Sequence, residues 1–478
     1  MTTTAAAPRR ARLAAAWRSG PLGVRAFRLL TVGQFASTIG DYCYAVALPW
    51  LVLTDGGSAA TLGIVLACYG IPRAVLTLAG GSLADRFGPR LVMLASDAAR
   101  CGLTAVFAVL AAEHVSSLAA VAPVAAALGA CSALFLPASM TIMPALVEES
   151  RLTSANGLYT GVVQAGSMLG PVLGGVLVAA TGPTPAFAVD AGSFLVSAAS
   201  VALIRGAGRQ PARAVVGTAA ATTAVAADTA ATTGVAGDGM TAADEATAAR
   251  RAAAAGDGLA GDRLAGDGLA DAIGASAGSK PENVWGLLRR SPILQIILVV
   301  SVTANFALTG TTEVALPALA HARFGADGYG AVLTCVAAAS LAGALIVARV
   351  GDWPRPALLI AGAFLVAAAA IAAAPFLGGL PGAAAGMAVF GLALGFDNVV
   401  SVTMIQRWAP PALLGRVWGL LMLASVGSFP VSTFIAGQLV RHLGPTPVFP
   451  IAGAVLTLSM LYGLSRREFR DFRGESRG

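Results

Sequence analysis

The chain has 478 residues, of which 56% are hydrophobic and 12% are charged, and its formal net charge is +7. Soluble domains carry about 25% charged residues, so this composition excludes an ordinary soluble protein and predicts one that crosses a membrane many times. The basic residues stand at the ends of apolar segments and form no patch with aromatic side chains, which argues against nucleic-acid binding. The five cysteines lie inside apolar segments without paired spacing, so we expect neither disulfides nor a metal site.

Twelve apolar segments follow one another along the chain, and each is long enough to cross a bilayer as a helix of about 20 residues. The first is too long for the apolar part of a signal peptide and is interpreted as a membrane span that follows an N-terminal tail at 1–26. The predicted spans are 27–53, 60–83, 91–112, 117–143, 154–180, 184–204, 291–318, 327–348, 357–377, 382–406, 416–440 and 446–464.

Residues 206–284 separate the first six spans from the last six and have a different composition. They consist largely of Ala, Gly, Thr and Asp and include the near-repeat AGDGL AGDRL AGDGL at 255–269. With so few large apolar side chains the segment cannot offset the entropy of ordering, so we expect a disordered linker. A calcium site is disfavoured because the acids are few and the ligand pattern of a calcium loop is missing.

The basic residues also predict the orientation. If the N-terminus is cytoplasmic, all but Arg73, Arg100, Arg323 and Arg441 of the 31 Lys and Arg residues lie in cytoplasmic segments. Positive charge concentrates on the cytoplasmic side of membrane proteins. Both termini, the linker and the C-terminal tail at 466–478 are therefore predicted to be cytoplasmic.

The two sets of spans resemble each other. TIMPALV begins at Thr141 and TMIQRWA at Thr403, and NGL begins at Asn156 where WGL begins at Trp418, both with an offset of 262 residues. The sequence therefore predicts an all-α membrane protein with 12 transmembrane helices in two pseudo-symmetric six-helix bundles, at 27–205 and 285–465. Such duplicated halves are typical of transporters.

The stretch GSLADRFGPR at 81–90 places an acid and two Arg between the second and third spans. It resembles motif A of the major facilitator superfamily, with matches at Gly81, Asp85, Arg86, Gly88 and Arg90. The resemblance implies a cytoplasmic latch in which Asp85 meets the N-terminus of the eleventh helix, where free N–H groups favour an anion. The alternative is a tight turn whose Arg side chains only fix the orientation.

The stretch GSMLGPVLGG at 166–175, in span five, resembles motif C of exporters in the same superfamily. Three of its glycines recur every four residues and would share one helix face for close packing, while the proline would bend the helix. A generic small-residue packing face is the alternative. The matching residues are Gly166, Gly170, Pro171, Gly174 and Gly175.

The resemblance to the major facilitator superfamily extends over nearly the whole chain outside the linker. The stretches at 33–53, 97–100 and 410–420 resemble the branch with the enterobactin exporter and macrolide-efflux-like proteins. Span four, however, lacks the Arg of motif B of proton antiporters. The resemblance implies the major facilitator fold and an exporter that works by alternating access.

Ionisable and polar side chains inside the spans are candidate functional residues, because a charge in the bilayer is costly. Asp41 and Asp397 are candidates for proton coupling. Asp41 could meet Arg73 near the membrane centre, either as a coupling pair or as a purely structural ion pair. Candidates for the substrate pathway are Arg73, Gln164, Asn305 and Asn398, although hydrogen bonds between helices would explain such polar residues equally well.

Four further ionisable residues are predicted nearer the span ends. Asp97 and Arg100, three residues apart at the inner end of span three, are expected to pair and to support the latch. Asp190 and Glu313, toward the outer ends of spans six and seven, are expected to be solvated or to have gating roles.

The sequence favours a proton-coupled exporter of amphipathic small molecules in a bacterial cell membrane, as a monomer and without a cofactor. The alternative is an importer or symporter of a small metabolite with the same fold, and a transporter-like sensor is a third possibility. No phosphate-binding G-x-x-x-x-G-K-[ST] motif occurs, so ATP is not expected to drive transport. An enzyme is not expected, because His114, His321 and His442 fall in separate predicted external loops.

Overall fold

The computed structural model describes residues 20–54, 56–148, 151–204, 288–289, 291–350, 355–409 and 411–470. Twelve of its helices are long and apolar enough to cross a membrane, and each coincides with one predicted span. They are α2 (Arg25–Thr54), α3 (Ala59–Phe87), α4 (Pro89–Ala112), α5 (Leu118–Leu146), α6 (Leu152–Thr181), α7 (Pro183–Ala202), α12 (Pro292–Gly310) with its continuation, α14 (Gly325–Val350), α15 (Pro356–Ala373), α16 (Gly379–Trp408), α17 (Pro411–Leu443) and α18 (Val448–Ser465).

The seventh span changes its winding within its length. After α12 the chain forms a π-helical turn, η3 (Thr311–Ala315), and then continues as α13 (Leu316–Arg323). A π-helical turn inserts an extra residue into an α-helix, and such turns are frequent at functional sites. Glu313, predicted near the outer end of this span, lies in the π-helical turn and is half-buried.

The turns between consecutive spans follow from glycine and proline. Gly88 ends α3 and precedes α4 with φ +86°, and Gly182 does the same between α6 and α7 with φ +82°. A side chain is disfavoured at such φ values, and the proline that follows each glycine suits the first position of a helix. α3 thus ends at Phe87 and α4 begins at Pro89, so the chain turns tightly at Gly88 whether or not the loop also forms a latch.

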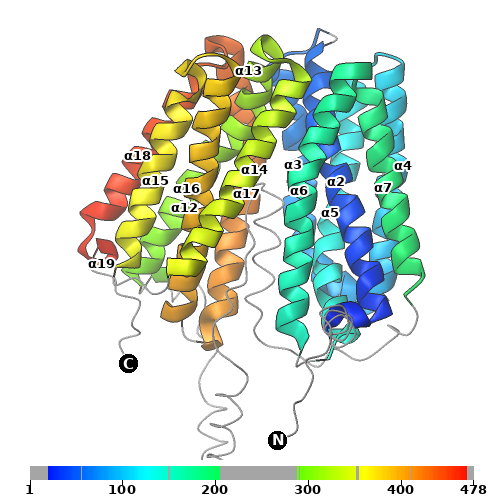
Figure 1. Ribbon diagram of the computed structural model, residues 1–478, viewed down its shortest axis with the longest axis horizontal. Coiled ribbons are helices and arrows are strands. Elements are labelled where there is room, and N and C mark those ends of the chain that lie inside the picture. The colour runs from blue at the N-terminus through cyan, green and yellow to red at the C-terminus, as the bar shows by residue number, and fades with distance from the viewer. Residues whose placement is uncertain are drawn as a thin grey trace, which may run out of the picture. The chain divides into compact units, whose positions relative to one another are not determined.

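The first six spans and the last six are packed in the same order, so the predicted pair of pseudo-symmetric bundles is confirmed. In the first half α3 packs on α5, α5 on α4, and α4 on α7. In the second half the equivalent contacts are α14 on α16, α16 on α15, and α15 on α18. Figure 1 shows α4, α5 and α7 grouped together, and α15, α16 and α18 grouped together.

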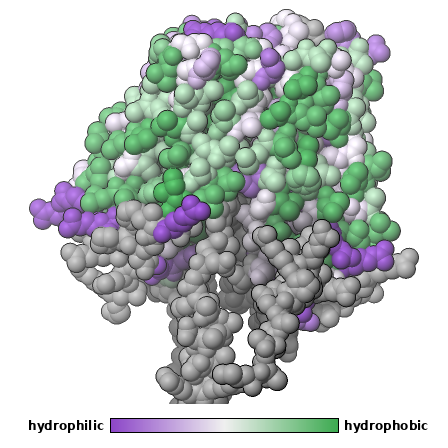
Figure 2. All heavy atoms as spheres, viewed as in Figure 1, coloured by the Kyte–Doolittle hydropathy of each residue, from purple (hydrophilic) through white to green (hydrophobic). Residues whose placement is uncertain are grey.

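The outer faces of the helices are apolar. Val75, Leu195 and Leu458 each expose more than 60% of their surface, and they belong to three different helices. In Figure 2 apolar residues cover the flanks of the helices, while hydrophilic residues gather toward the helix ends. Contiguous apolar surface of this extent requires lipid around it. The chain is therefore a multi-pass membrane protein.

The predicted tails differ in part from the structure. A short helix, η1 (Pro21–Gly23), precedes α2 inside the predicted N-terminal tail. The predicted C-terminal tail begins with α19 (Arg467–Arg470), which buries Phe469 to 2% exposure. These residues pack because each segment carries an apolar side chain that contacts the adjoining bundle. The linker at 206–284 lies outside the described residues and stays a prediction.

By its contacts the chain divides into two units, one of residues 1–235 and 296–478 and the other of residues 236–295. Of the second unit, the structure describes only 288–289 and 291–295. All contacts discussed below lie within the first unit.

Candidate functional site

The two halves meet along two seams of small residues. In one seam α3 packs against α17, and in the other α6 packs against α14. A Cβ added to Gly63 of α3 would lie 3.0 Å from the Cα of Gly437 in α17, and a Cβ added to Gly175 of α6 would lie 3.1 Å from the Cα of Gly330 in α14. Glycine therefore sets the spacing of the two halves, because larger side chains would force the helices apart.

The two seams are related by the internal repeat. Gly175 and Gly437 are 262 residues apart, which is the offset that relates the halves in sequence. Gly63 and Gly330 each lie in the second turn of their helix, and Gly175 and Gly437 lie in the last two turns of theirs. All four glycines thus occupy the end of the bundles where α2 ends and α3 begins, which we call the α2–α3 end.

A cluster of aromatic side chains joins the halves at this same end. The Trp50 ring of α2 stacks on Tyr329 of α14 with 5.9 Å between ring centroids, and it meets the edge of His321 in α13 at 5.3 Å. Nε2 of His321 lies 3.4 Å from the hydroxyl oxygen of Thr54. His321, predicted in a loop, is therefore part of a helix and of a contact between the halves.

The glycines of the predicted motif C occupy two faces of α6. Added Cβ atoms at Gly166, Gly170 and Gly174 would each come within 3 Å of α2, which confirms one shared packing face. Gly175 instead faces α14 across the seam. Pro171 lies inside α6, and its carbonyl oxygen lies against Gly330. The motif therefore fixes α6 both to its own half and to the other half.

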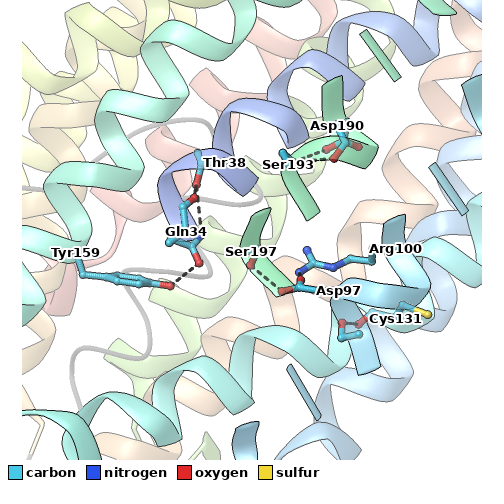
Figure 3. A network of polar contacts seen from close by, with 10 residues as sticks. Gln34, Thr38, Asp97, Arg100, Cys131, Tyr159, Asp190, Ser193 and Ser197 are labelled. Carbon is cyan, nitrogen blue, oxygen red and sulfur yellow. Dashed lines mark hydrogen bonds and ion pairs between the residues drawn. The ribbon is translucent and has the colours of Figure 1, made fainter. Parts of the chain in front are cut away.

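Inside the first half lies a buried ion pair. Arg100 and Asp97 of α4 form the predicted contact, with side chains 5% and 0% exposed. Ser197 of α7 donates a hydrogen bond to Oδ2 of Asp97 at 2.7 Å. The Arg100 guanidinium lies 4.3 Å from the ring centroids of both Phe135 and Phe194. Figure 3 shows the pair pressed against Ser197.

The depth of this pair differs from the prediction. α4 starts at Pro89, so Asp97 is its ninth residue and Arg100 its twelfth of 24. The pair therefore lies in the middle of the bundle and not at the inner end of the span. Its partners come from α5 and α7, so nothing in its contacts supports a role in the predicted latch.

Asp190 of α7 is a second buried acid whose surroundings differ from the prediction. It was predicted near the outer end of its span with a solvated or gating role, yet it is 1% exposed. Solvation is wrong because Asp190, Ser193 and Ser197 share one face of α7, which packs against α2 and α4. A Cβ added to Gly40 of α2 would lie 2.5 Å from Oδ1 of Asp190.

The remaining candidate residues of the first half are buried or half-buried. Asp41 is half-buried and follows Gly40 in α2. Arg73 is 8% exposed, with its guanidinium 5.6 Å from the centre of the Tyr69 ring. Gln164 is 4% exposed. Their burial agrees with positions away from lipid, but the Asp41–Arg73 pair stays a prediction.

In the second half, Asp397 and Asn305 have hydrogen-bond partners. The Ser401 hydroxyl donates to Oδ1 of Asp397 at 3.0 Å within α16. Ser425 of α17 donates to Oδ1 of Asn305 at 2.9 Å, so Asn305 connects α12 with α17. For Asn305 the alternative of a hydrogen bond between helices is therefore realised. Asn398 is half-buried beside Asp397, and its place in the pathway stays a prediction.

One polar contact was missed in the sequence. The Tyr159 hydroxyl of α6 donates to Oε1 of Gln34 in α2 at 2.8 Å, and Nε2 of Gln34 donates to Thr38 at 3.3 Å (Figure 3). Gln34 stands seven residues before Asp41, two turns away along the same helix face. This spacing is the feature of the sequence that would have indicated Gln34 as a polar residue of the interior.

The loop that resembles motif A is described only in part. Arg90 donates from Nε to the carbonyl oxygen of Val201 at 3.2 Å and from Nη2 to that of Ala202 at 2.6 Å. It therefore satisfies carbonyl groups at the C-terminal end of α7. Arg86 is exposed, with its guanidinium over the Phe87 ring. The surroundings of Gly81 and the side chains of Asp85 and of 411–416, where the latch would close, lie outside the described residues, so the latch stays a prediction.

Comparison with known proteins agrees with this architecture. The model of the Major Facilitator Superfamily matches residues 30–396. The solved structure of a D-xylose-proton symporter superposes with a TM-score of 0.65 at 14% identity and covers 95% of this chain and 99% of that one. At this identity the likeness concerns the fold alone.

Two curated relatives are similar to part of the chain. The multidrug efflux pump Tap of Mycolicibacterium fortuitum is 34% identical over 194 residues, which cover 39% of this chain and 46% of that protein. The methylenomycin A resistance protein of Bacillus subtilis is 31% identical over 171 residues, which cover 35% of each. The matched part thus spans less than half the length of these relatives.

Proposed function

We propose that this chain, which belongs to the Major Facilitator Superfamily, is a secondary active transporter that exports amphipathic small molecules by alternating access. Proton entry would drive the export. The transporter would lie in a bacterial cell membrane with both termini in the cytoplasm, and it would work as a monomer without a cofactor.

The observation that carries alternating access is the pair of seams at the α2–α3 end. Rocking of one half against the other requires contacts that can separate as a unit, and each seam joins one helix pair through glycines. The Trp50, His321 and Tyr329 cluster lies between the same halves. With cytoplasmic termini, this end faces outward, and its contacts close the outer side.

Export is supported by the names of the two relatives, an efflux pump and a resistance protein. The glycine face of α6 also matches the residues of motif C. The alternative of an importer has no such support, because the similarity to the D-xylose-proton symporter concerns the fold alone. The buried and half-buried acids Asp41, Asp190 and Asp397 supply groups that could bind a coupled proton.

The first test is growth. A bacterial host without its main efflux pumps would express the wild type, Asp41→Asn or the control Glu113→Gln, which changes an exposed acid at the end of α4. We expect the wild type and the control to protect against members of a panel of toxic amphipathic compounds, and Asp41→Asn to protect less. Sensitisation by the wild type would instead favour import.

A further inference from the structure

Asp190 lies where α2, α4 and α7 meet, and neither motif of the sequence includes it. It is 1% exposed, and Oδ1 accepts a hydrogen bond from the Ser193 hydroxyl at 3.4 Å. The Ser193 hydroxyl also donates to the backbone carbonyl of Asp190 at 2.7 Å, which is the shorter contact. A carboxylate at such depth needs either a cation or a proton, because an isolated buried charge costs many kcal/mol.

The charged and titratable groups around Asp190 contain more acids than bases. The α2 side contributes Asp41, Cys43 and Tyr44, and the α4 side contributes Arg100, all within electrostatic reach of the carboxylate. Asp97 also belongs to the cluster, because it holds Arg100 in the buried ion pair. One guanidinium thus interacts with two deeply buried acids: it contacts Asp97 and lies within electrostatic reach of Asp190.

Arg100 has an unused donor in this arrangement. Nη2 serves Asp97, whereas among the described residues the buried Nε of Arg100 has no hydrogen-bond partner. A buried donor without a partner is destabilising, so a new acceptor within reach would be bound. Asp97 bonds Ser197, and Asp190 lies seven residues away on α7, about 10 Å along its axis. Figure 3 shows Asp97 against Arg100 and Ser197, with Asp190 and Ser193 farther along α7.

We propose that Asp190 binds the coupled proton and that Arg100 is the cation that takes the proton's place when it leaves. In the arrangement described here Asp190 holds the proton and Arg100 pairs with Asp97. When the O–H bond of Asp190 breaks, the proton passes to water, and the new carboxylate accepts a hydrogen bond from Nε of Arg100. Binding of a proton from water restores the first arrangement.

This switch would act on α2, which is held between α6 and α7. A Cβ added to Gly33 of α2 would lie 3.2 Å from the Cα of Ser197, and Gly40 lies against Asp190 itself. A change in charge at Asp190 therefore acts directly on the face of α2 at Gly40. The same helix carries Asp41 and ends near Trp50 at the seam between the halves. The inference rests on the proposed proton coupling and names the residue that performs it.

The test measures protonation directly and needs no substrate. Infrared difference spectra of the purified protein in lipid nanodiscs, recorded over a pH series, report the C=O stretch of protonated carboxylic acids. We expect Asp190→Asn to lose one titrating component that the wild type shows. The control Asp327→Asn, which alters an exposed acid at the start of α14, should keep it. Identical titrating bands in Asp190→Asn and the wild type would overturn the assignment.

The role of Arg100 is tested through its other partner. In Asp97→Asn the guanidinium is free for Asp190, so the Asp190 component should titrate at lower pH than in the wild type, and in Arg100→Gln it should titrate at higher pH. Ser197→Ala removes only the hydrogen bond that holds Asp97, so it should act like Asp97→Asn but more weakly. Ser197→Ala replaces Asp97→Asn in the test if Asp97→Asn does not fold. An Asp190 component that stays at its wild-type pH in Ser197→Ala and Arg100→Gln would overturn the switch.

These outcomes separate the inference from the proposed function. A wild-type protein that exports nothing while the Asp190 component titrates as described would contradict the proposed function alone. Proton-driven export that persists at the wild-type rate in Asp190→Asn would contradict the inference alone. A more than tenfold loss of proton-driven export in Asp190→Asn, with unchanged export in Asp327→Asn, would support both.

Discussion

Gly175 of α6 and Gly330 of α14 face each other across the seam between the two halves, and a Cβ added to either would lie 3.1 Å from the Cα of the other. Gly63 and Gly437 repeat this relationship on the symmetry-related seam. Contacts between backbones leave no side chain to adapt, so the two halves fit together at one spacing.

The first prediction concerns this spacing. Gly175→Val should push α6 and α14 apart, because overpacking costs about 1–3 kcal/mol. Export should fall about tenfold or more. Growth protection and dye export measure the effect. Gly102→Val is the matched control, since an added Cβ at Gly102 of α4 meets nothing within 4 Å. Equal loss in both variants would contradict the role of the seam.

The second prediction concerns the aromatic cluster. Trp50→Ala removes the contacts with Tyr329 and His321, and an aromatic pair contributes about 0.5–1.5 kcal/mol. The α2–α3 end should therefore open more often, by about two- to tenfold. In a cysteine-free background, the labelling rate of a single cysteine at Ala318 in α13 should rise accordingly. Phe376→Ala, which removes a ring that is 64% exposed, is the control. An unchanged rate would show that the cluster does not hold this end closed.

The third prediction separates two Arg residues of one loop. Arg90→Ala removes hydrogen bonds to the carbonyl groups that end α7 and should lower the free energy of unfolding by about 1–2 kcal/mol. Arg86→Ala removes an exposed guanidinium and should leave it almost unchanged. Thermal unfolding in detergent, followed by tryptophan fluorescence, ranks the two variants. The reverse order would refute this division of roles.

The fourth prediction tests the latch. If Asp85 meets the start of the eleventh span, Asp85→Asn should favour the inward-open state several-fold, since a charge at a helix N-terminus contributes about 0.3–1 kcal/mol or more when partly buried. Labelling of single cysteines at Thr141 and Gln406, at the predicted inner ends of α5 and α16, should rise, and labelling at the outer end should fall. Glu148→Gln, an exposed acid on the same side, is the control. Unchanged accessibility on both sides would leave the loop as a turn that only fixes orientation.

The sequence contains the local part of this structure. Span lengths, the repeat offset and the glycine spacing of α6 are properties of short segments, and each was predicted from the residues alone. The Asp97–Arg100 pair was also predicted, because residues three apart on a helix must be neighbours.

What could not be predicted depends on which helices pack together. The depth of Asp97, the burial of Asp190 and the pairing of Trp50 with Tyr329 arise from contacts between residues far apart in the chain. Asp190 was misplaced because hydropathy locates a residue along a span but does not say which face of the helix is covered. Ser193 and Ser197 share the covered face with Asp190, but this face is identified only when α2 and α4 are known to pack against it.

The most direct measurement of the central claim is proton-driven movement of ethidium, or of a compound found in the growth test, in vesicles of purified protein. Transporters inserted with their cytoplasmic side outward should carry the dye into vesicles that have an acidic interior, while protons leave the vesicle. An ionophore that collapses the proton gradient should abolish this uptake. Proton-coupled export predicts this result for the wild type and for Glu113→Gln. Uptake that requires an acidic exterior, or that proceeds equally without a gradient, would contradict it.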